Sequence, residues 1–160
     1  METFEIRPAT PEDARAMAEL FAAVAEERDG IAAEPPVDVG ARTAQFAASA
    51  DATLVAVAGD NVVGNIHVEA SRFGFGELGM NVAREWRGRG VGSALLRAAI
   101  ERAREQGLHK LSLEVWPHNE AALALYRKFG FVEEGRRVEH YRRASGELWD
   151  AIVMGLRLRD

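Results

Sequence analysis

Two different spacings of hydrophobic residues recur along this chain of 160 residues, and they separate predicted strands from predicted helices. Alternating apolar and polar residues are typical of strands that bury one face. Such segments cover residues 4–7, 54–58, 62–68, 110–116, 132–141 and 148–156, and a further one ends at 82. Apolar residues at every third or fourth position indicate helices instead. Such segments run from 11 to about 30, over 41–50 and 91–106, and through the residues that follow 119.

Turn and cap residues mark the ends of several of these elements. Thr10-Pro11 precedes the first helix as a cap and a first-position proline, and Gly59-Asp60-Asn61 joins two strands as a tight hairpin. The resulting order, βααβββαβαββ, indicates an α/β (α+β) fold in which helices cover both faces of a mixed, mostly antiparallel sheet of about seven strands. No repeat or linker interrupts this order, so we expect one domain over residues 1–160.

Composition and charge exclude several kinds of protein. The formal net charge is −5, which argues against a dedicated nucleic-acid binder, because such proteins neutralise phosphates with a basic surface. No cysteine is present, which excludes disulfides and thiolate chemistry and is compatible with a reducing cytoplasm. The sequence contains neither an N-terminal signal pattern nor an apolar run of about 20 residues. We therefore expect a cytoplasmic protein with no membrane and no nucleic-acid partner.

The most informative segment joins the strand that ends at Val82 to the helix that begins at Val91. Gly88, Gly90 and Gly92 alternate along it. Glycines at this junction leave the first N–H groups of the helix without side-chain cover, and the positive end of the helix dipole lies at the same place. Such an end binds anions, phosphates above all. In this loop and the following helix, six arginines against three glutamates give a local charge of +3, which fits a small polyanion.

Together with a second segment, the glycine loop resembles the signature of the GCN5-related N-acetyltransferases, the GNAT family. The loop reads Arg87-x-x-Gly90-x-Gly92, like the acyl-CoA pyrophosphate loop of that family. Downstream, an Asn119-x-x-Ala122-x-x-x-Tyr126 helix is closed by Gly130-Phe131. One glycine loop is weak on its own, but both motifs occur in the family's order with a strand between them. The resemblance covers residues 78–135.

The resemblance implies acetyl-CoA as co-substrate, an amine-bearing acceptor and no metal. By position, the residues that would hold the pantetheine arm and the pyrophosphate are Val82, Ala83, Arg84, Arg87, Gly88, Arg89, Gly90, Val91, Gly92, Ser93, Ala94, Leu95 and Asn119. A backbone N–H near Val82 is expected to face the thioester carbonyl. Among the arginine side chains, phosphate contact is favoured for Arg87 and Arg89, whereas those further along the helix fit a solvated face.

Two side chains carry the chemistry that the resemblance implies. Glu114 precedes Tyr126 by twelve residues, a spacing that resembles the family members that acetylate peptide N-terminal amines. There the glutamate assists deprotonation of the amine and the tyrosine donates to the departing sulfur. An α-amine with a pKa near ~8 is roughly a tenth neutral at pH 7, against less than about a thousandth for lysine, so a carboxylate base favours α-amines. Without a cysteine or a Gly-x-Ser-x-Gly turn, direct attack in a ternary complex is the simpler scheme.

Several interpretations of these residues stay open at this level. Tyr126 also fits a core aromatic, Glu114 a solvent-facing strand residue and Asn119 a helix N-cap, and Glu77 is an alternative base. The acceptor is open between a free amino acid, a peptide N-terminus, a polyamine and an antibiotic amine. Its walls are expected from residues 29–39, from the turn at 73–76 and from the last two strands. Homodimerisation through those strands is common in such families.

Two other functions compete with acetyl transfer. A dinucleotide-dependent oxidoreductase would use Gly88-x-Gly90 as the start of its fingerprint and Glu114 as the ribose-binding acid, but Ser93 replaces the third glycine and only one βαβ unit is present. A non-catalytic acyl-CoA sensor would keep the binding loop without turnover. The four histidines show no spacing typical of metal ligands.

Overall fold

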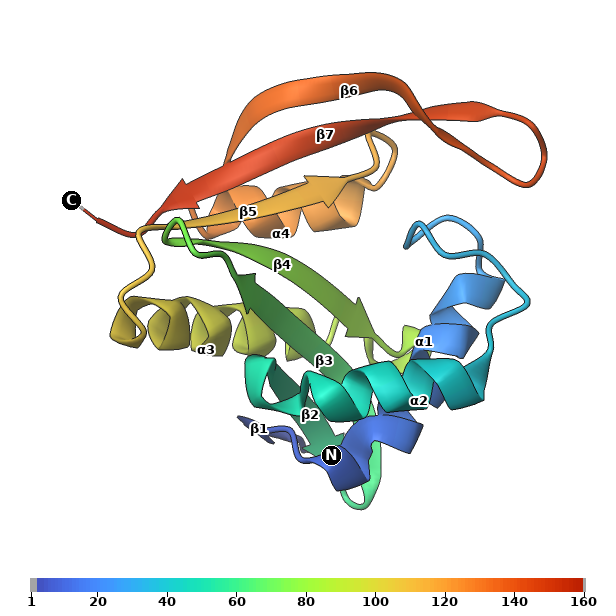
Figure 1. Cartoon of the computed structure of the whole chain (residues 1–160), viewed down its shortest axis with the longest axis vertical. Coiled ribbons are helices and arrows are strands. Elements are labelled where there is room, and N and C mark those ends of the chain that lie inside the picture. The colour runs from blue at the N-terminus through green and yellow to red at the C-terminus, as the bar shows by residue number, and fades with distance from the viewer. Residues whose placement is uncertain (1–2, 160) are drawn as a thin grey trace.

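The computed structural model describes residues 3–159, and its strands form one sheet in the order β1-β2-β3-β4-β5-β7-β6 (Figure 1). The strands are β1 (Glu5–Pro8), β2 (Thr53–Ala58), β3 (Asn61–Ala70), β4 (Phe75–Val82), β5 (Lys110–Val115), β6 (Val132–Arg142) and β7 (Leu148–Arg157). Every neighbouring pair is antiparallel except β4 and β5, which run parallel. The sheet confirms the predicted mixed, mostly antiparallel arrangement.

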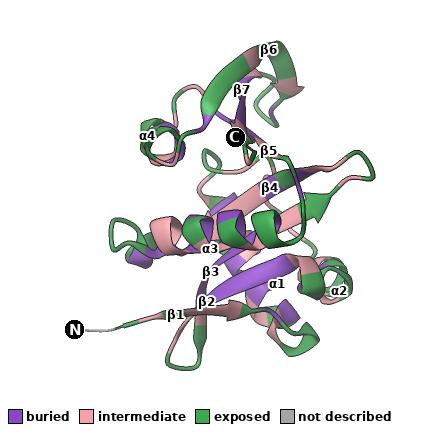
Figure 2. Cartoon of the chain, turned by 90° about the vertical axis from the view of Figure 1, so that its left-hand side faces the viewer, coloured by how far each residue is buried: buried purple, intermediate pink, exposed green. Residues whose placement is uncertain are grey.

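Helices cover both faces of this sheet (Figures 1 and 2). On one face lie α1 (Ala14–Glu26) and α2 (Val39–Ala48), and on the other lie α3 (Val91–Glu105) and α4 (Glu120–Lys128). Short 3-10 turns cover Pro11–Asp13, Ala50–Ala52 and Arg84–Trp86. The order of elements is the predicted one. The first helix ends earlier than expected, because Arg28 adopts a left-handed φ of 63°, which a continuing helix excludes.

The core lies mainly between the sheet and α3. Leu95 and Leu96 on α3 are fully buried and belong to one core cluster with strand residues such as Leu111 and Met154. A smaller cluster fills the space between β2, α1 and α2. The buried positions of α3 recur every three or four residues, as the sequence pattern predicts. By contrast, the edge strand β6 is almost entirely exposed (Figure 2). None of the helices among residues 3–159 combines the length and the apolar character needed to cross a membrane.

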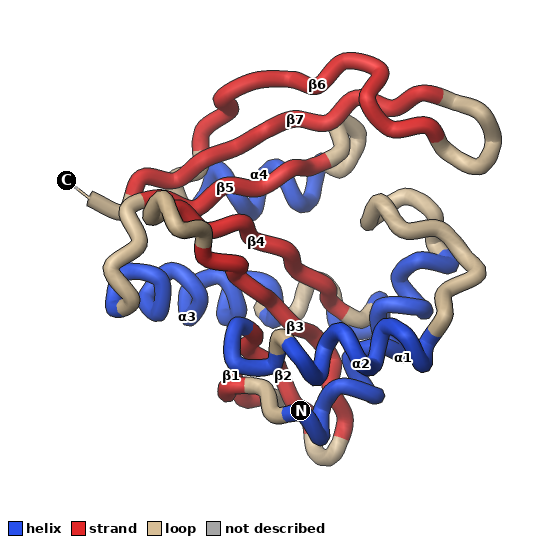
Figure 3. The backbone as a smooth tube through the Cα atoms, in the orientation of Figure 1, coloured by secondary structure: helices blue, strands red, loops and turns tan. Residues whose placement is uncertain are grey.

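The two halves of the sheet separate at the middle of β4. β4 pairs with β5 only from Phe75 to Glu77, whereas it stays paired with β3 as far as Val82. β5 continues instead along β7, up to Val115. Figure 3 shows the two strands diverging beyond their short common stretch. The second half of β4 therefore presents an edge without a strand partner in the middle of the sheet.

Candidate active site

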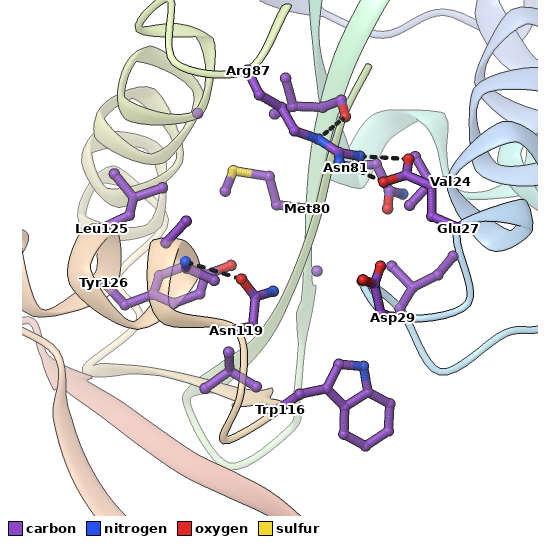
Figure 4. A pocket seen from close by; sticks show the side chains of 18 of the residues that line it. Val24, Glu27, Asp29, Met80, Asn81, Arg87, Trp116, Asn119, Leu125 and Tyr126 are labelled. Atoms are coloured by element: carbon purple, nitrogen blue, oxygen red, sulfur yellow. Dashed lines mark hydrogen bonds and ion pairs between the residues drawn. The ribbon is translucent and has the colours of Figure 1, made fainter. Parts of the chain in front are cut away.

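A cavity of about 980 Å³ occupies the space between the diverging strands. Its walls come from the second half of β4, the end of β5, the first turns of α3 and α4, and the loop that follows α1 (Figure 4). Segments from across the chain thus meet at one place. Both sequence motifs, the glycine loop and the Asn119–Tyr126 helix, contribute to the same cavity.

The free edge of β4 directs backbone groups into this cavity. The Ala83 N–H donates to Val63 O at 2.8 Å. Backbone groups alternate in direction along an antiparallel pair, so Met80 and Val82, which lie between the bonded positions, turn their N–H and C=O groups away from β3. The carbonyl of Val82 accepts a hydrogen bond from Arg87 Nε at 3.1 Å. The N–H groups of Met80 and Val82 therefore lie on the edge that borders the cavity.

The N-terminus of α3 meets the cavity with unbonded amides. The first backbone bond of this helix runs from Ala94 N–H to Gly90 O at 3.0 Å, and no side chain caps the end. The N–H groups of Val91, Gly92 and Ser93 consequently lack a backbone partner. Gly90 has a φ of 88°, a conformation that side chains disfavour, and it lets the chain turn sharply into the helix. Unbonded amides therefore lie where the glycine pattern predicts an anion site.

The side chains of Arg87 and Arg89 contact other protein groups. The sequence had favoured phosphate contact for both side chains. Arg87 forms a bidentate ion pair with Glu27 at the end of α1, with distances of 2.6 and 2.8 Å. This pair holds the pKa of Glu27 below its usual range, mainly through the hydrogen bonds from Arg87. Arg89 lies over the ring of Trp86 at 3.9 Å from its centroid and donates to Glu85 O. Arg87 therefore ties the loop to α1, and Arg89 covers Trp86.

Tyr126 lies on the cavity wall that α4 forms. Its residue exposure is 7%, and its ring packs edge-on against Phe131 at 5.6 Å. Burial raises the pKa of its hydroxyl to about 12. No described residue accepts a hydrogen bond from that hydroxyl, and Tyr126 lines the cavity. The hydroxyl is thus an unpaired donor at the cavity surface, where a bound ligand can accept its hydrogen bond.

Asn119 begins α4 and also borders the cavity. Its Oδ1 accepts the Ala122 N–H at 3.2 Å, so it is the N-cap of this helix. Its Nδ2 has no partner among the residues that the structure describes, and Figure 4 shows the side chain turned toward the cavity. Capping and ligand contact are thus compatible in this residue.

Glu114 lines the cavity at the end of β5, but both of its oxygens are engaged. Oε1 lies 2.6 Å from Arg137 Nε, and Oε2 accepts a hydrogen bond from the Tyr141 hydroxyl. The bond to Glu114, with some burial, raises the pKa of Tyr141 to about 12. Because β6 and β7 form a twisted hairpin beside β5, these partners from β6 reach the carboxylate. Glu114 is therefore one member of a three-residue network at the cavity wall.

Comparison with known proteins decides the family. Residues 15–131 match the family model described as "Acetyltransferase (GNAT) family", which is more than half of the chain. The chain belongs to the GNAT family. The expected resemblance is thereby confirmed, and the fold agrees with it.

Individual GNAT relatives agree with this assignment. Escherichia coli L-amino acid N-acetyltransferase AaaT is 33% identical over 106 residues, which is 63% of this chain and 65% of AaaT. The crystal structure of ribosomal-protein-alanine N-acetyltransferase from Brucella melitensis superposes with a TM-score of 0.87 at 30% identity, covering 96% of this chain and 99% of that one. A phosphinothricin acetyltransferase from Sinorhizobium meliloti, solved in complex with AcCoA, shares the fold with a TM-score of 0.85 at 21% identity, over 97% and 88% of the two chains. The chain spans about half to two thirds of the length of the curated relatives it matches.

Most of the GNAT-type cofactor residues named from the sequence border the cavity. Those that do are Val82, Arg84, Arg87, Gly88, Gly90, Gly92, Ser93 and Asn119. The others do not line it, namely Ala83, Arg89, Val91, Ala94 and Leu95. Val91 and Leu95 turn their side chains into the core, and the N–H groups of Ala83 and Ala94 are bonded to the backbone. The list taken from the resemblance therefore includes residues, such as Val91 and Leu95, whose side chains hold α3 against the core.

The acceptor end differs in part from the sequence expectation. The loop after α1 contributes Asp29, Gly30, Ile31 and Ala32, and β6 contributes Tyr141, as expected. The turn at 73–76 does not line the cavity, because it lies at the opposite end of β4, and Phe73 is 68% exposed. Glu77, the alternative base, is exposed in the paired part of β4 and likewise lies off the cavity.

Asp29 is a site residue that sequence reasoning did not single out. Its carboxylate faces the cavity from the α1 side, across from Asn119 and Tyr126 (Figure 4). No hydrogen bond or ion pair with another described residue engages it. An aspartate just beyond a helix end is unremarkable in a sequence, so only the folded loop reveals its position.

The fold argues against the dinucleotide-dependent alternative. A dinucleotide-binding fold needs a mostly parallel sheet, whereas only β4 and β5 pair in parallel here, and the family assignment excludes it as well. Among residues 3–159, no group of three or more histidine or acidic side chains is arranged to hold a metal ion.

Proposed function

We propose that this protein is an N-acetyltransferase that moves an acetyl group from acetyl-CoA to a primary amine by direct attack in a ternary complex. One observation carries the proposal: a single cavity joins the unbonded N-terminus of α3 to the unpartnered hydroxyl of Tyr126. The first end fits a diphosphate, and the second fits a departing sulfur. The Sinorhizobium neighbour with bound AcCoA supports the choice of co-substrate.

The residues present fit acetyl-CoA, which supplies the acetyl group as a thioester when it is bound. The amides of Val91, Gly92 and Ser93 would hold the pyrophosphate, because they are unbonded and lie at the positive end of the α3 dipole. The free edge of β4 would pair with the pantetheine arm as an added strand does. The N–H of Val82 is our candidate donor to the carbonyl oxygen at which charge develops.

Tyr126 is proposed to stabilise the leaving sulfur through a hydrogen bond. With a pKa of about 12, against roughly 8.5 for a thiol, full proton transfer would be unfavourable by about 5 kcal/mol. The same raised pKa keeps the hydroxyl protonated at all physiological pH values. Tyr126 thus acts as a fixed donor, and the thiolate takes its final proton from water.

Glu114 is proposed to receive the proton of the amine, through a water molecule. A carboxylate is a weak base, so it takes a proton readily only from an amine that releases it easily. An α-amine, which is roughly a tenth neutral at pH 7, meets this condition better than a lysine does. The names of two similar proteins, an L-amino acid N-acetyltransferase and a ribosomal-protein-alanine N-acetyltransferase, agree with an α-amine acceptor.

Two further expectations accompany this function. We propose a cytoplasmic location, in keeping with the absence of cysteine. We also propose a homodimer through the C-terminal strands, where Val132 and Val138 on the edge strand β6 are 60% and 69% exposed. Light scattering tests the dimer, because one chain has a mass of 17.5 kDa.

The proposed function is tested with purified protein in two measurements. Calorimetry with acetyl-CoA tests the binding loop, and a free-thiol assay tests turnover against L-amino acids, an alanine-terminated peptide, spermidine and an aminoglycoside. Binding with thiol release that depends on one of these amines is expected. Tight binding without release from any amine would favour the acyl-CoA sensor, and absence of binding would reject both functions.

A further inference from the structure

The acceptor end of the cavity is closed by two segments that are distant in sequence. One is the loop between α1 and α2, of which Gly30–Ala32 line the cavity. The other is the hairpin turn between β6 and β7, which begins at Arg143. Figures 1 and 3 show both at the same end of the molecule, facing each other. The loop has no regular secondary structure of its own, so its position depends on side-chain contacts.

Arg143 connects these two segments from a buried position. Its exposure is only 5%. Nη1 donates to Ala32 O at 2.8 Å and Nη2 donates to Arg28 O at 3.2 Å. The guanidinium also lies over Trp149 at 4.4 Å and near Trp116 at 5.1 Å from the ring centroids. A single planar cation thus binds the loop with its edge and the aromatic wall with its face.

A second contact reinforces the same connection. The Ala144 N–H donates to Glu34 Oε2 at 2.7 Å, and Glu34 Oε1 lies 3.8 Å from Arg143 Nη2. The buried charge of Arg143 is therefore balanced by a carboxylate as well as by two carbonyls. Together, Arg143, Ala144 and Glu34 form a latch between the hairpin and the loop, and we use this name for the three residues below.

The latch also adjoins the wall residues that an acceptor would touch. Trp116 lines the cavity and packs edge-on against Tyr141 at 5.1 Å, and Tyr141 in turn donates to Glu114. Ala32, whose carbonyl Arg143 holds, lines the opposite wall. The distance between these two walls sets the width of the acceptor entrance. Arg143 fixes both walls without lining the cavity itself.

We propose that Arg143 is a positioning residue for the amine acceptor, because it holds the loop of residues 28–34 against the aromatic wall. This inference rests on the proposed function. It assigns no role to Arg143 in binding acetyl-CoA, since the contacts of its guanidinium are with the loop and the aromatic wall and not with the glycine loop or α3. Loss of the latch frees the acceptor wall and leaves the acetyl-CoA site unchanged.

The test compares Arg143→Met and Arg143→Lys with the control Arg142→Met, which removes a neighbouring exposed arginine. The acceptor is the amine that gives the lowest KM with the unaltered protein. In Arg143→Met, the KM for this amine is expected to rise at least tenfold, with kcat within threefold and the Kd for acetyl-CoA within twofold. Lysine keeps the charge but lacks the planar fork, so Arg143→Lys should recover part of the loss. The control should match the unaltered protein in all three constants.

Limited trypsin digestion measures how accessible the loop of residues 28–34 is to cleavage. Cleavage after Arg28 should be faster in Arg143→Met than in the control variant, because the Arg28 carbonyl loses its donor. If Arg143→Met does not fold, Glu34→Ala leaves Arg143 in place and removes the carboxylate that contacts Ala144, Arg143 and Arg28. This variant should raise the acceptor KM by at least threefold.

The outcomes separate the two proposals. If the unaltered protein turns over and the acceptor KM is unchanged in Arg143→Met, the role of Arg143 is overturned. Where Arg143→Met does not fold, an unchanged acceptor KM in Glu34→Ala overturns it. An equal loss of acetyl-CoA affinity also overturns it, because it would indicate a general structural effect. No thiol release by the unaltered protein with any amine rejects the proposed function instead.

Discussion

Replacing Tyr126 by phenylalanine removes one atom from the cavity and leaves the packing of α4 in place. The ring keeps its edge-on contact with Phe131, and no described residue loses a hydrogen bond. A hydroxyl that faces the cavity and has no protein partner contributes little to stability, so the free energy of unfolding should change by less than about 1 kcal/mol. Because the substitution leaves the unbonded amides of α3 in place, the Kd for acetyl-CoA should also stay the same.

Turnover should fall markedly in the same variant. Loss of the donor to the departing sulfur is expected to lower kcat by about 10- to 1,000-fold, which corresponds to roughly 1.4 to 4 kcal/mol in the barrier. The assay is free-thiol release at saturating acetyl-CoA, with urea unfolding and calorimetry as controls on the same preparation. An unchanged kcat in a folded, acetyl-CoA-binding variant would remove Tyr126 from the mechanism.

The pH profile gives an independent check on this assignment. With a pKa of about 12, Tyr126 keeps its proton throughout the accessible range, so its ionisation should cause no loss of activity below about pH 10. A tyrosine at its ordinary pKa near ~10 would begin to lose activity at that point. An alkaline loss near pH 9 that disappears in Tyr126→Phe would therefore contradict the buried, protonated donor inferred from the structure.

Three further predictions concern the glycine loop and the ion pairs. Gly90 and Gly107 lie at the two ends of α3, and both have a positive φ and open space around them. Replacing either by alanine should lower the free energy of unfolding by about 1–2 kcal/mol. Only Gly90→Ala should also weaken acetyl-CoA binding, as measured by calorimetry. If Arg87 acts by holding the glycine loop against α1, Glu27→Gln should weaken acetyl-CoA binding as much as Arg87→Gln does. If Arg87 contacts the phosphates directly, Glu27→Gln should leave the affinity for acetyl-CoA unchanged. The hydrogen bonds from Arg7 lower the pKa of Asp13 to about 2. The ionised Asp13 therefore stabilises the fold above its unfolded pKa near ~3.9, and this stabilisation is lost as the pH falls to about 2. The free energy of unfolding in urea should depend less on pH across that range in Asp13→Asn than in the unaltered protein.

Much of the fold could be predicted from the sequence, because its signals are local. The buried face of α3 follows from apolar residues spaced by three or four, and the β2–β3 hairpin follows from its Gly59-Asp60 turn. The N-cap at Asn119 and the sharp turn at Gly90 depend on side-chain and backbone preferences within a few residues. Such preferences depend only on residues close together in the chain, so they can be predicted from the sequence.

The engagement of the charged side chains could not be predicted in this way. Arg87 is separated from Glu27 by 60 positions and Arg143 from Ala32 by 111, and nothing near either arginine indicates its partner. Glu114 has the spacing of a base, yet only the twisted β6–β7 hairpin brings Arg137 and Tyr141 to its two oxygens.

By itself, the sequence determined the order of the elements and the bare helix end at Gly90, because each depends on residues close together in the chain. Only the tertiary structure decided where β4 and β5 part, what each arginine holds and that the carboxylate of Asp29 faces the cavity. Those outcomes depend on how the two halves of the sheet pack their helices, and packing joins residues without regard to their distance along the chain.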